Sequence, residues 1–186
     1  MWEILDTDES VRVRTVAVAV VLLVIASVVQ VSVVARLDLP GGRFDLVLVL
    51  LASVALIEGP LVGAISGFVA GLVADLASTH VLGQSALVMC LIGYAVGLVM
   101  DAAEQSVAVP LVVIGGAGAL GTLGYGAITS LLGEAAMTGG EAVGRALAAG
   151  LYAMLATPFV FPLLSRGARR LAGDRRLAGD RRRGGR

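Results

Sequence analysis

Few residues of this chain have the type and spacing that catalysis or metal binding requires. His80 is the only histidine and no serine motif accompanies it, so a histidine-based triad would depend on this residue alone. Cys90 is the only cysteine and lies in an apolar run, which indicates a small buried side chain without disulfide or metal spacing. All fourteen basic residues are arginine, which excludes a phosphate-binding Gly-x-x-x-x-Gly-Lys sequence. We predict no catalytic, cofactor-binding or metal-binding residue, and a protein that is not an enzyme.

The acids beside apolar runs are the remaining chemical candidates. Asp75 lies at the end of a long apolar run, where a charge costs less than the roughly 2.5–3.5 kcal/mol assigned to the centre of a membrane span. Two interpretations stay open for it. Asp75 is an interfacial acid or a cap on the next helix, or it orders the loop 75–83 or pairs with an arginine of a partner. Glu58 and Asp101 are interpreted as boundary acids, and the absence of mid-span charges argues against an ion-coupled transporter.

The most regular pattern in the chain leads up to Asp75. Glycines recur every four residues and Asp75 takes the next place in the series. In a soluble helix each glycine would cost about 1 kcal/mol relative to alanine. In a membrane helix the same spacing forms a flat strip that another backbone can approach closely. The glycine ladder consists of Gly59, Gly63, Gly67 and Gly71, and a shorter series of Gly93 and Gly97 ends at Asp101.

The ladder winds around its helix. A step of four residues overshoots a 3.6-residue turn by about 40°, so the strip from Gly59 to Asp75 turns by about 160°. One straight neighbour cannot cover all of it, and we expect a junction between at least two helices. The Gly93/Gly97 face is one candidate neighbour and an outside partner is the other. Whether these glycines pack inside the bundle or face a partner stays open.

Bulk composition sets the class of protein. The chain has 186 residues, is 58% hydrophobic and 15% charged, and has a mean hydropathy of +0.93, which indicates an integral membrane protein. The first apolar run, residues 13–35, exceeds the 7–15 residues of a signal-peptide core. We therefore expect an uncleaved first span.

Polar breaks divide the chain into six apolar runs. The second run has only about 14 residues, so it either packs deep among neighbours or borrows residues from its flanks. A five-span alternative makes that run re-entrant. Pro158 and Pro162 are expected to kink the last span. The predicted spans are residues 13–35, 44–57, 61–77, 84–100, 108–132 and 143–164.

The arginines predict the topology. With six spans, Arg12, Arg14 and nine tail arginines share one side, against Arg36, Arg43 and Arg145 on the other. Eleven against three places both termini in the cytoplasm. The predicted domains are a cytoplasmic N-terminal tail (1–11), a six-helix transmembrane domain (12–165) and a disordered arginine-rich cytoplasmic tail (166–186).

The tail repeats the hexapeptide Arg-Arg-Leu-Ala-Gly-Asp and carries nine arginines and two aspartates, a side-chain charge of +7. We expect it to fix orientation and to contact anionic lipid, at about 1 kcal/mol per charge near the surface. A cytoplasmic protein is the alternative partner, and nucleic acid is not expected. The predicted lipid and orientation residues are Arg166, Arg169, Arg170, Arg175 and Arg176.

One series of residues resembles a known family. Gly63-x-x-x-Gly67-Phe68-x-x-Gly71-Leu72-x-x-Asp75, then Leu82-Gly83 and Gly93-Tyr94-x-x-Gly97, resembles the rod shape-determining protein MreD family. The resemblance covers residues 44–100 in motif and 12–165 in layout. The arginine-repeat tail is no part of the family pattern.

The resemblance implies a non-enzymatic scaffold of the bacterial elongation machinery (the elongasome) in the plasma membrane. It implies a contact with MreC, and through it a connection between MreB filaments and peptidoglycan synthesis by RodA and its class B penicillin-binding protein. The implied fold is all-α and polytopic: a compact, glycine-rich bundle of six transmembrane helices, similar to the substrate-binding subunits of energy-coupling-factor transporters.

That likeness keeps open an alternative function, a small-molecule-binding subunit of a vitamin-type transporter, although the sequence shows no polar cluster to line a pocket. A lipid-directed enzyme would need acid/base or metal residues that are absent. Oligomeric state, including a homodimer, stays open. The predicted helix-packing or partner-interface residues are Gly59, Gly63, Gly67, Phe68, Gly71, Asp75, Gly83, Gly93, Tyr94 and Gly97.

Overall fold

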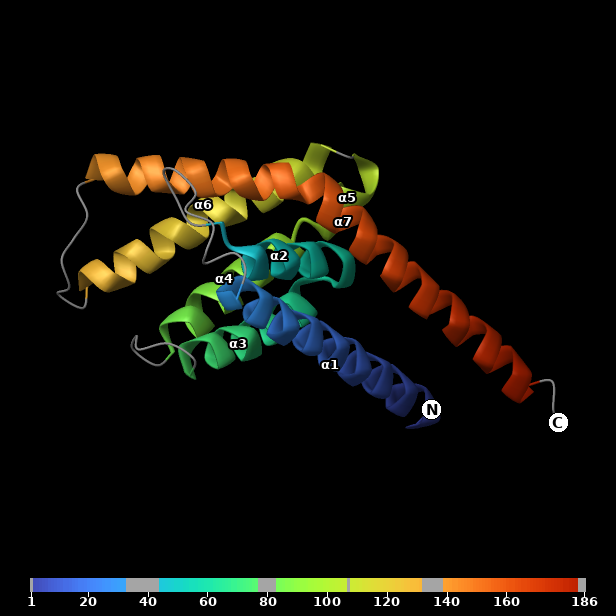
Figure 1. The fold of residues 1–186 in the computed structure, drawn as a ribbon. Coiled ribbons are helices and arrows are strands. Elements are labelled where there is room, and N and C mark those ends of the chain that lie inside the picture. Colours follow the sequence, from blue (N-terminus) through green and yellow to red (C-terminus); the bar gives the residue numbers. More distant parts are fainter. Residues whose placement is uncertain (1, 33–43, 77–82, 107, 132–138, 184–186) are drawn as a thin grey trace.

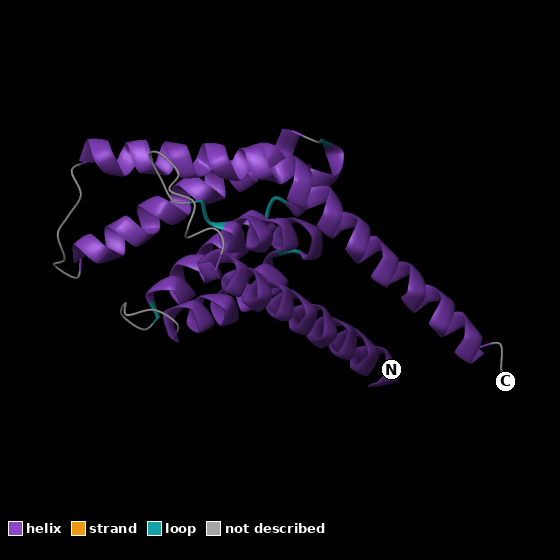
Figure 2. Cartoon of the chain, in the orientation of Figure 1, coloured by secondary structure: helices purple, strands orange, loops and turns teal. Residues whose placement is uncertain are grey.

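The computed structural model describes residues 2–32, 44–76, 83–106, 108–131 and 139–183. Within these ranges the chain folds into helices and short turns, without strands (Figure 2). The prediction of an all-α protein is confirmed for this part of the chain. The helices are α1 (Trp2–Ser32), α2 (Leu46–Glu58), α3 (Pro60–Leu76), α4 (Gln84–Gly97), α5 (Met100–Gln105), α6 (Ala108–Leu131) and α7 (Gly139–Arg183).

The helices fall into two length classes. Three described segments are long and apolar enough to cross a membrane: Val13–Gln30 in α1, Ala108–Leu131, and Gly139–Ala168 in α7. The other apolar helices are shorter, with 13 residues in α2, 17 in α3 and 14 in α4. At 1.5 Å per residue α2 is about 20 Å long, against about 30 Å for a hydrocarbon core. Length and composition alone therefore identify three of the six predicted spans.

The short helix α2 lies at the centre of the bundle. In Figure 1 it runs between α1, α3 and α4 on one side and α6 and α7 on the other. Leu51, Ala52 and Ala55 have no exposed surface. Because every face of α2 is apolar, it is most stable when surrounded by other helices. Its hydroxyl at Ser53 donates to the Val49 carbonyl oxygen at 2.7 Å, so no polar group is stranded there. Of the two interpretations of this short run, deep packing is correct.

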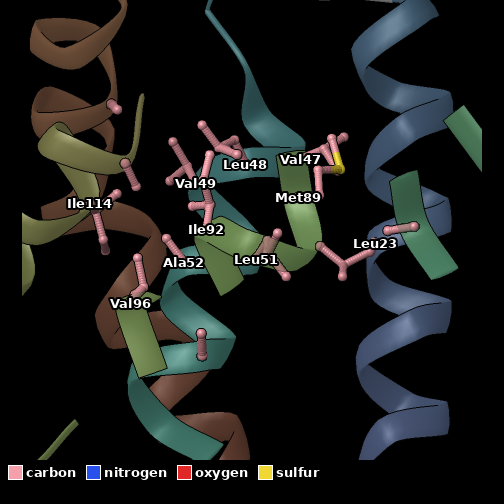
Figure 3. Packing of buried hydrophobic residues seen from close by; sticks show 14 of the residues in the cluster. Leu23, Val47, Leu48, Val49, Leu51, Ala52, Met89, Ile92, Val96 and Ile114 are labelled. Carbon is pink, nitrogen blue, oxygen red and sulfur yellow. The ribbon is translucent and has the colours of Figure 1, made fainter. Parts of the chain in front are cut away.

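The hydrophobic core joins five helices around α2 (Figure 3). Leu23 of α1, Leu51 of α2 and Ile114 of α6 are each at most 1% exposed, and Met89 and Ile92 of α4 lie between them. In lipid such burial does not remove apolar surface from water, because lipid is as apolar as leucine. The core is therefore stabilised chiefly by close packing between these side chains.

A second close contact joins α6 to α7. A Cβ built on Gly115 would lie 3.2 Å from the Gly150 carbonyl oxygen, and one on Gly150 would lie 2.9 Å from the Gly115 carbonyl oxygen. Gly118 faces Ala149 and Ala153 in the same way. Small residues thus let the two long helices approach closely. The spacing of these glycines does not by itself show which helix they pack against.

The start of α1 and the end of α7 lie toward the same side of the molecule (Figure 1). The helix α7 contains Pro158 and Pro162 and changes direction between its first and second halves. Proline lacks the N–H that would bond to the preceding turn and its ring crowds that turn, so a bend is expected there. The predicted kink is present.

The structure differs from the sequence prediction at both ends of the described chain and after α4. The first helix begins at Trp2 instead of following a separate tail, and a short helix, α5, follows α4. The helix α7 continues to Arg183, where the sequence predicted a disordered segment from Arg166. The repeat is low in complexity, but arginine, leucine and alanine are good helix formers, and this local preference continues the helix.

Candidate functional site

The glycine ladder is the contact surface between α3 and α4. A Cβ on Gly63, Gly67 or Gly71 would lie less than 3.0 Å from a backbone oxygen of α4. Those oxygens belong to Gly93, Met89 and Ser85, in the order expected for antiparallel helices. Since backbone atoms cannot move aside as a flexible side chain can, only glycine permits this spacing. The ladder glycines therefore pack against another helix of the same chain.

The contact is reciprocal. A Cβ on Gly93 would overlap the Gly63 carbonyl, and one on Gly97 would overlap the backbone of Pro60. The shorter glycine series therefore packs against the ladder. This series is the first of the two neighbours that the sequence offered for the ladder. Helix α2 covers the flank of the ladder, where Ala55 and Leu51 come within 3.2 Å of the positions of the missing side chains.

One helix covers more of the ladder than its winding predicts. Helix α4 follows the ladder from Gly63 to Asp75, farther than expected of one straight neighbour. Gly59 lies at the edge of this contact: its carbonyl carbon would be 2.6 Å from a Cβ built on Gly97 of α4, and a Cβ built on Gly59 itself would be 3.5 Å from the Met100 sulfur of α5. The ladder is therefore a junction of α3 with α4, α2 and α5.

Two glycines at helix ends are required by backbone conformation. Gly59 ends α2 with φ of 90°, and its N–H donates to the Ala55 carbonyl oxygen at 2.9 Å. Gly83 begins α4 with φ of 98°. Residues with a Cβ rarely adopt these positive values. These two positions redirect the chain between α2 and α3, and at the start of α4.

Asp75 caps α4 from the last turn of α3. Its carboxylate accepts the N–H of Gly83 at 2.8 Å, of Ser85 at 3.0 Å and of Ala86 at 3.3 Å, and the side chain is 1% exposed. The first N–H groups of a helix have no partner within it, and the positive end of the helix dipole favours an anion. Asp75 therefore fastens the end of α3 to the start of α4, which agrees with the interpretation of Asp75 as a cap.

A polar cluster surrounds this cap, at the end of the bundle where α2 and α4 begin. Gln30 of α1 donates to the Phe44 carbonyl oxygen at 2.7 Å and accepts the Leu46 N–H at 2.8 Å. Gln84 donates to the Tyr125 carbonyl oxygen and to the Thr129 hydroxyl of α6. The polar cluster consists of Gln30, Asp45, Asp75, Gln84, Ser85, Tyr125 and Thr129.

Hydrogen bonds within the protein satisfy the polar cluster. Asp45 accepts the Leu48 N–H at 3.0 Å and so caps α2. Among the described residues, no buried side-chain nitrogen or oxygen lacks a hydrogen-bond partner. The sequence showed no such cluster, although Gln30 and Gln84 are polar residues at the edges of apolar runs.

Phe68 and Tyr94 lie on the opposite face of the α3–α4 pair from the core. Their side chains are 49% and 50% exposed, unlike the buried ladder glycines beside them. Both helices present further exposed apolar residues at helical spacing. We call this surface the outer face; it consists of Leu61, Ile65, Phe68 and Leu72 of α3, Leu87, Leu91 and Tyr94 of α4, and Leu98 directly after α4.

The remaining candidates are peripheral. Arg166 is exposed on α7, and the side chains of Arg169, Arg170, Arg175 and Arg176 lie outside the described part of the structure. His80 also lies outside the described residues. Cys90 is half-buried in α4. Across the described ranges, no three His, Cys, Asp or Glu side chains are grouped so as to hold a metal ion.

Comparison with known protein families gives a match over most of the chain. The family model described as "rod shape-determining protein MreD" matches residues 11–166. No curated protein and no solved structure matches the chain. The matched region begins within α1 and includes the α3–α4 pair, the polar cluster and the first 28 residues of α7.

Proposed function

Because the chain belongs to the rod shape-determining protein MreD family, which has a role in rod shape determination, we propose that it is a non-catalytic scaffold of the cell-elongation machinery. In this proposal the chain binds MreC in the bacterial plasma membrane. It thereby helps to couple MreB filaments to peptidoglycan synthesis by RodA and its class B penicillin-binding protein.

The proposed membrane arrangement has six spans with both termini in the cytoplasm. Three helices have the length of full spans, and α2, α3 and α4 are apolar helices of 13–17 residues. The short helices pack against one another, and α2 has little surface for lipid to contact. The start of α1 and the end of α7 lie toward one side (Figure 1), which agrees with an even number of crossings and with the arginine distribution.

The observation that carries a partner-binding role is the outer face. The close glycine contact fixes α3 and α4 as one unit, and Phe68 and Tyr94 project from its exposed side. Helices associate in lipid through packing and interhelical hydrogen bonds, and this face offers two aromatic rings and the Tyr94 hydroxyl. We therefore assign the MreC transmembrane helix to the outer face, and internal packing to the ladder glycines.

The test is co-purification of MreC from native membranes with tagged chain carrying Phe68→Ala and Tyr94→Ala together. We expect the captured MreC to fall about tenfold, as for loss of two interface side chains of about 0.7 kcal/mol each. Leu151→Ala on α7, whose side chain is 56% exposed, is the matched control and retains capture. Undiminished capture by the double variant at normal membrane abundance contradicts the assignment.

The polar cluster favours a second candidate, a small-molecule-binding subunit resembling those of vitamin transporters. Polar side chains from several helices converge there, as such a site requires. Their donors and acceptors are already bonded within the protein, which weighs against this candidate. Ligand-dependent thermal stabilisation of the purified chain in detergent would support it, and the absence of any stabilisation across vitamins would exclude it.

A further inference from the structure

The α3–α4 pair is shorter than a typical membrane is thick. Helix α3 has 17 residues and α4 has 14, which give lengths of about 25 and 21 Å. A typical hydrocarbon core is about 30 Å thick. Helix α6, with 24 residues, is about 36 Å long. Helix α2 separates α3 from α6 and α7 (Figure 1), so the two sides of the molecule differ in length.

Long and short helices respond differently to the thickness of the bilayer. A long helix can tilt until its apolar length fits, and α6 would need a tilt of about 34°, within the usual range. Tilting makes a short helix span even less. The pair cannot lengthen by sliding, because Gly63, Gly67 and Gly71 each contact the α4 backbone and hold one register. The length of about 25 Å is therefore an upper limit for the apolar thickness on this side.

Acidic residues mark both ends of the pair. Glu58, just before α3, and Asp101, just after α4, are both exposed. At the opposite end Asp75 caps α4, beside Gln84. A carboxylate is costly inside the hydrocarbon and much less so at its edge. The two levels of acids therefore set where the apolar core of the bilayer ends, and Glu58 and Asp75 are about 25 Å apart along the helix axis.

Long basic side chains are not available to relieve this mismatch. Lysine and arginine near a helix end can reach the headgroups while their Cα atoms lie deeper in the membrane. Residues 44–144 contain neither lysine nor arginine, and aspartate and glutamate are shorter. A short span without such residues is accommodated by thinning of the bilayer or by association with another helix.

The outer face is where lipid would meet this short pair. Phe68 is the middle residue of α3 and Leu91 lies near the middle of α4, with exposures of 49% and 60%. We propose that, in the chain without a partner, the outer face binds phospholipids with short acyl chains and thins the bilayer on this side. This proposal rests on the proposed membrane arrangement, in which α3 and α4 cross the bilayer. A partner helix on the outer face would displace these lipids and remove the mismatch.

Quenching of tryptophan fluorescence by brominated lipid tests the proposal. Trp2→Phe removes the only tryptophan, and Phe68→Trp or Leu91→Trp then introduces a single one on the outer face. The matched control is Leu120→Trp, near the middle of the long helix α6, where the native side chain is 62% exposed. Each full-length variant is reconstituted in brominated dioleoyl phosphatidylcholine mixed with an unbrominated phosphatidylcholine of shorter or longer chains. Competition between the two lipids gives the relative affinity at the labelled position.

We expect short-chain dimyristoleoyl phosphatidylcholine to bind at positions 68 and 91 about two- to threefold better than the dioleoyl lipid. Long-chain dierucoyl phosphatidylcholine should bind there more weakly than either. Position 120 should show no preference for the short-chain lipid, because α6 can tilt. Agreement between positions 68 and 91 shows that the preference belongs to the outer face and does not come from a local disturbance by one variant.

Three outcomes overturn the proposal. The first is that positions 68 and 91 show the same chain-length preference as position 120. The second is that bromine fails to quench positions 68 and 91 while their emission stays blue-shifted, which indicates that protein, such as a second copy, covers the outer face. In both cases the proposed membrane arrangement stands. The third is the red-shifted emission of water-exposed tryptophan at both positions, which also refutes the crossing of the bilayer by α3 and α4.

Discussion

Replacing Gly67 by alanine should destabilise the bundle, although alanine is the better helix former. The added methyl group would lie less than 3.0 Å from both the carbonyl oxygen and the carbonyl carbon of Met89, and 3.2 Å from a methyl carbon of Leu51. The Met89 atoms are backbone and cannot rotate away. The two helices must separate, which breaks the same close approach at Gly63 and Gly71.

The magnitude follows from two opposing effects. Overpacking a well-packed contact costs about 1–3 kcal/mol, and replacing glycine by alanine in a helix returns up to about 1 kcal/mol. We expect a net loss of about 1–2 kcal/mol. For a chain of this size that corresponds to a fall in melting temperature of roughly 2–8 °C.

The matched control is Gly116→Ala on α6. Gly116 is also a helical glycine, but a Cβ built there has no heavy atom within 4 Å, so only the helix preference remains. Its melting temperature should stay unchanged or rise slightly. Both variants are compared with wild type by thermal unfolding in one detergent, followed by size-exclusion chromatography. If the Gly67 variant is as stable as the Gly116 variant, the close α3–α4 contact is refuted.

Three further predictions test other parts of the account. Asp75→Ala should lower stability by about 1–2 kcal/mol and speed amide hydrogen exchange at the start of α4, because three N–H groups lose their acceptor; unchanged exchange would show that the cap is dispensable. Gln30→Ala should cost about 1 kcal/mol, since two bonds between α1 and the start of α2 are lost; thermal unfolding measures this, and a neutral result would remove Gln30 from the polar cluster's structural role. Phe68→Ala alone should reduce MreC capture by about threefold while Leu151→Ala leaves it unchanged, as measured by quantitative blotting of the co-purified protein; equal capture by both would move the partner surface away from the outer face.

Much of the α3–α4 contact could be predicted from the sequence. A glycine at every fourth position has few uses in a membrane helix besides close packing, and the second series ending near Asp101 marked its neighbour. The position of Asp75 at a helix end made a cap one of the interpretations that the sequence left open. What the spacing could not settle was the direction in which the glycines face, because that depends on how α2 and α4 pack around α3 in three dimensions.

The polar cluster could not be predicted in this way. Gln30, Gln84 and Thr129 are far apart in the sequence, and each alone is an ordinary polar residue near a helix end. Their hydrogen bonds depend on the ends of α1, α4 and α6 meeting at one end of the bundle. For residues 166–183, the low complexity of the sequence suggested disorder, whereas helix preference agrees with the continuation of α7 to Arg183 in the structure.

The most direct test of the account places a photoreactive amino acid at position 68, on the outer face, in cells that carry the chain as their only copy. The account predicts a crosslink between this position and the transmembrane segment of MreC, identified by mass spectrometry. The same amino acid at position 151 should give no such product. A crosslink to MreC from position 151 but not from position 68, or from neither, would contradict the assignment of the outer face as the partner-binding surface.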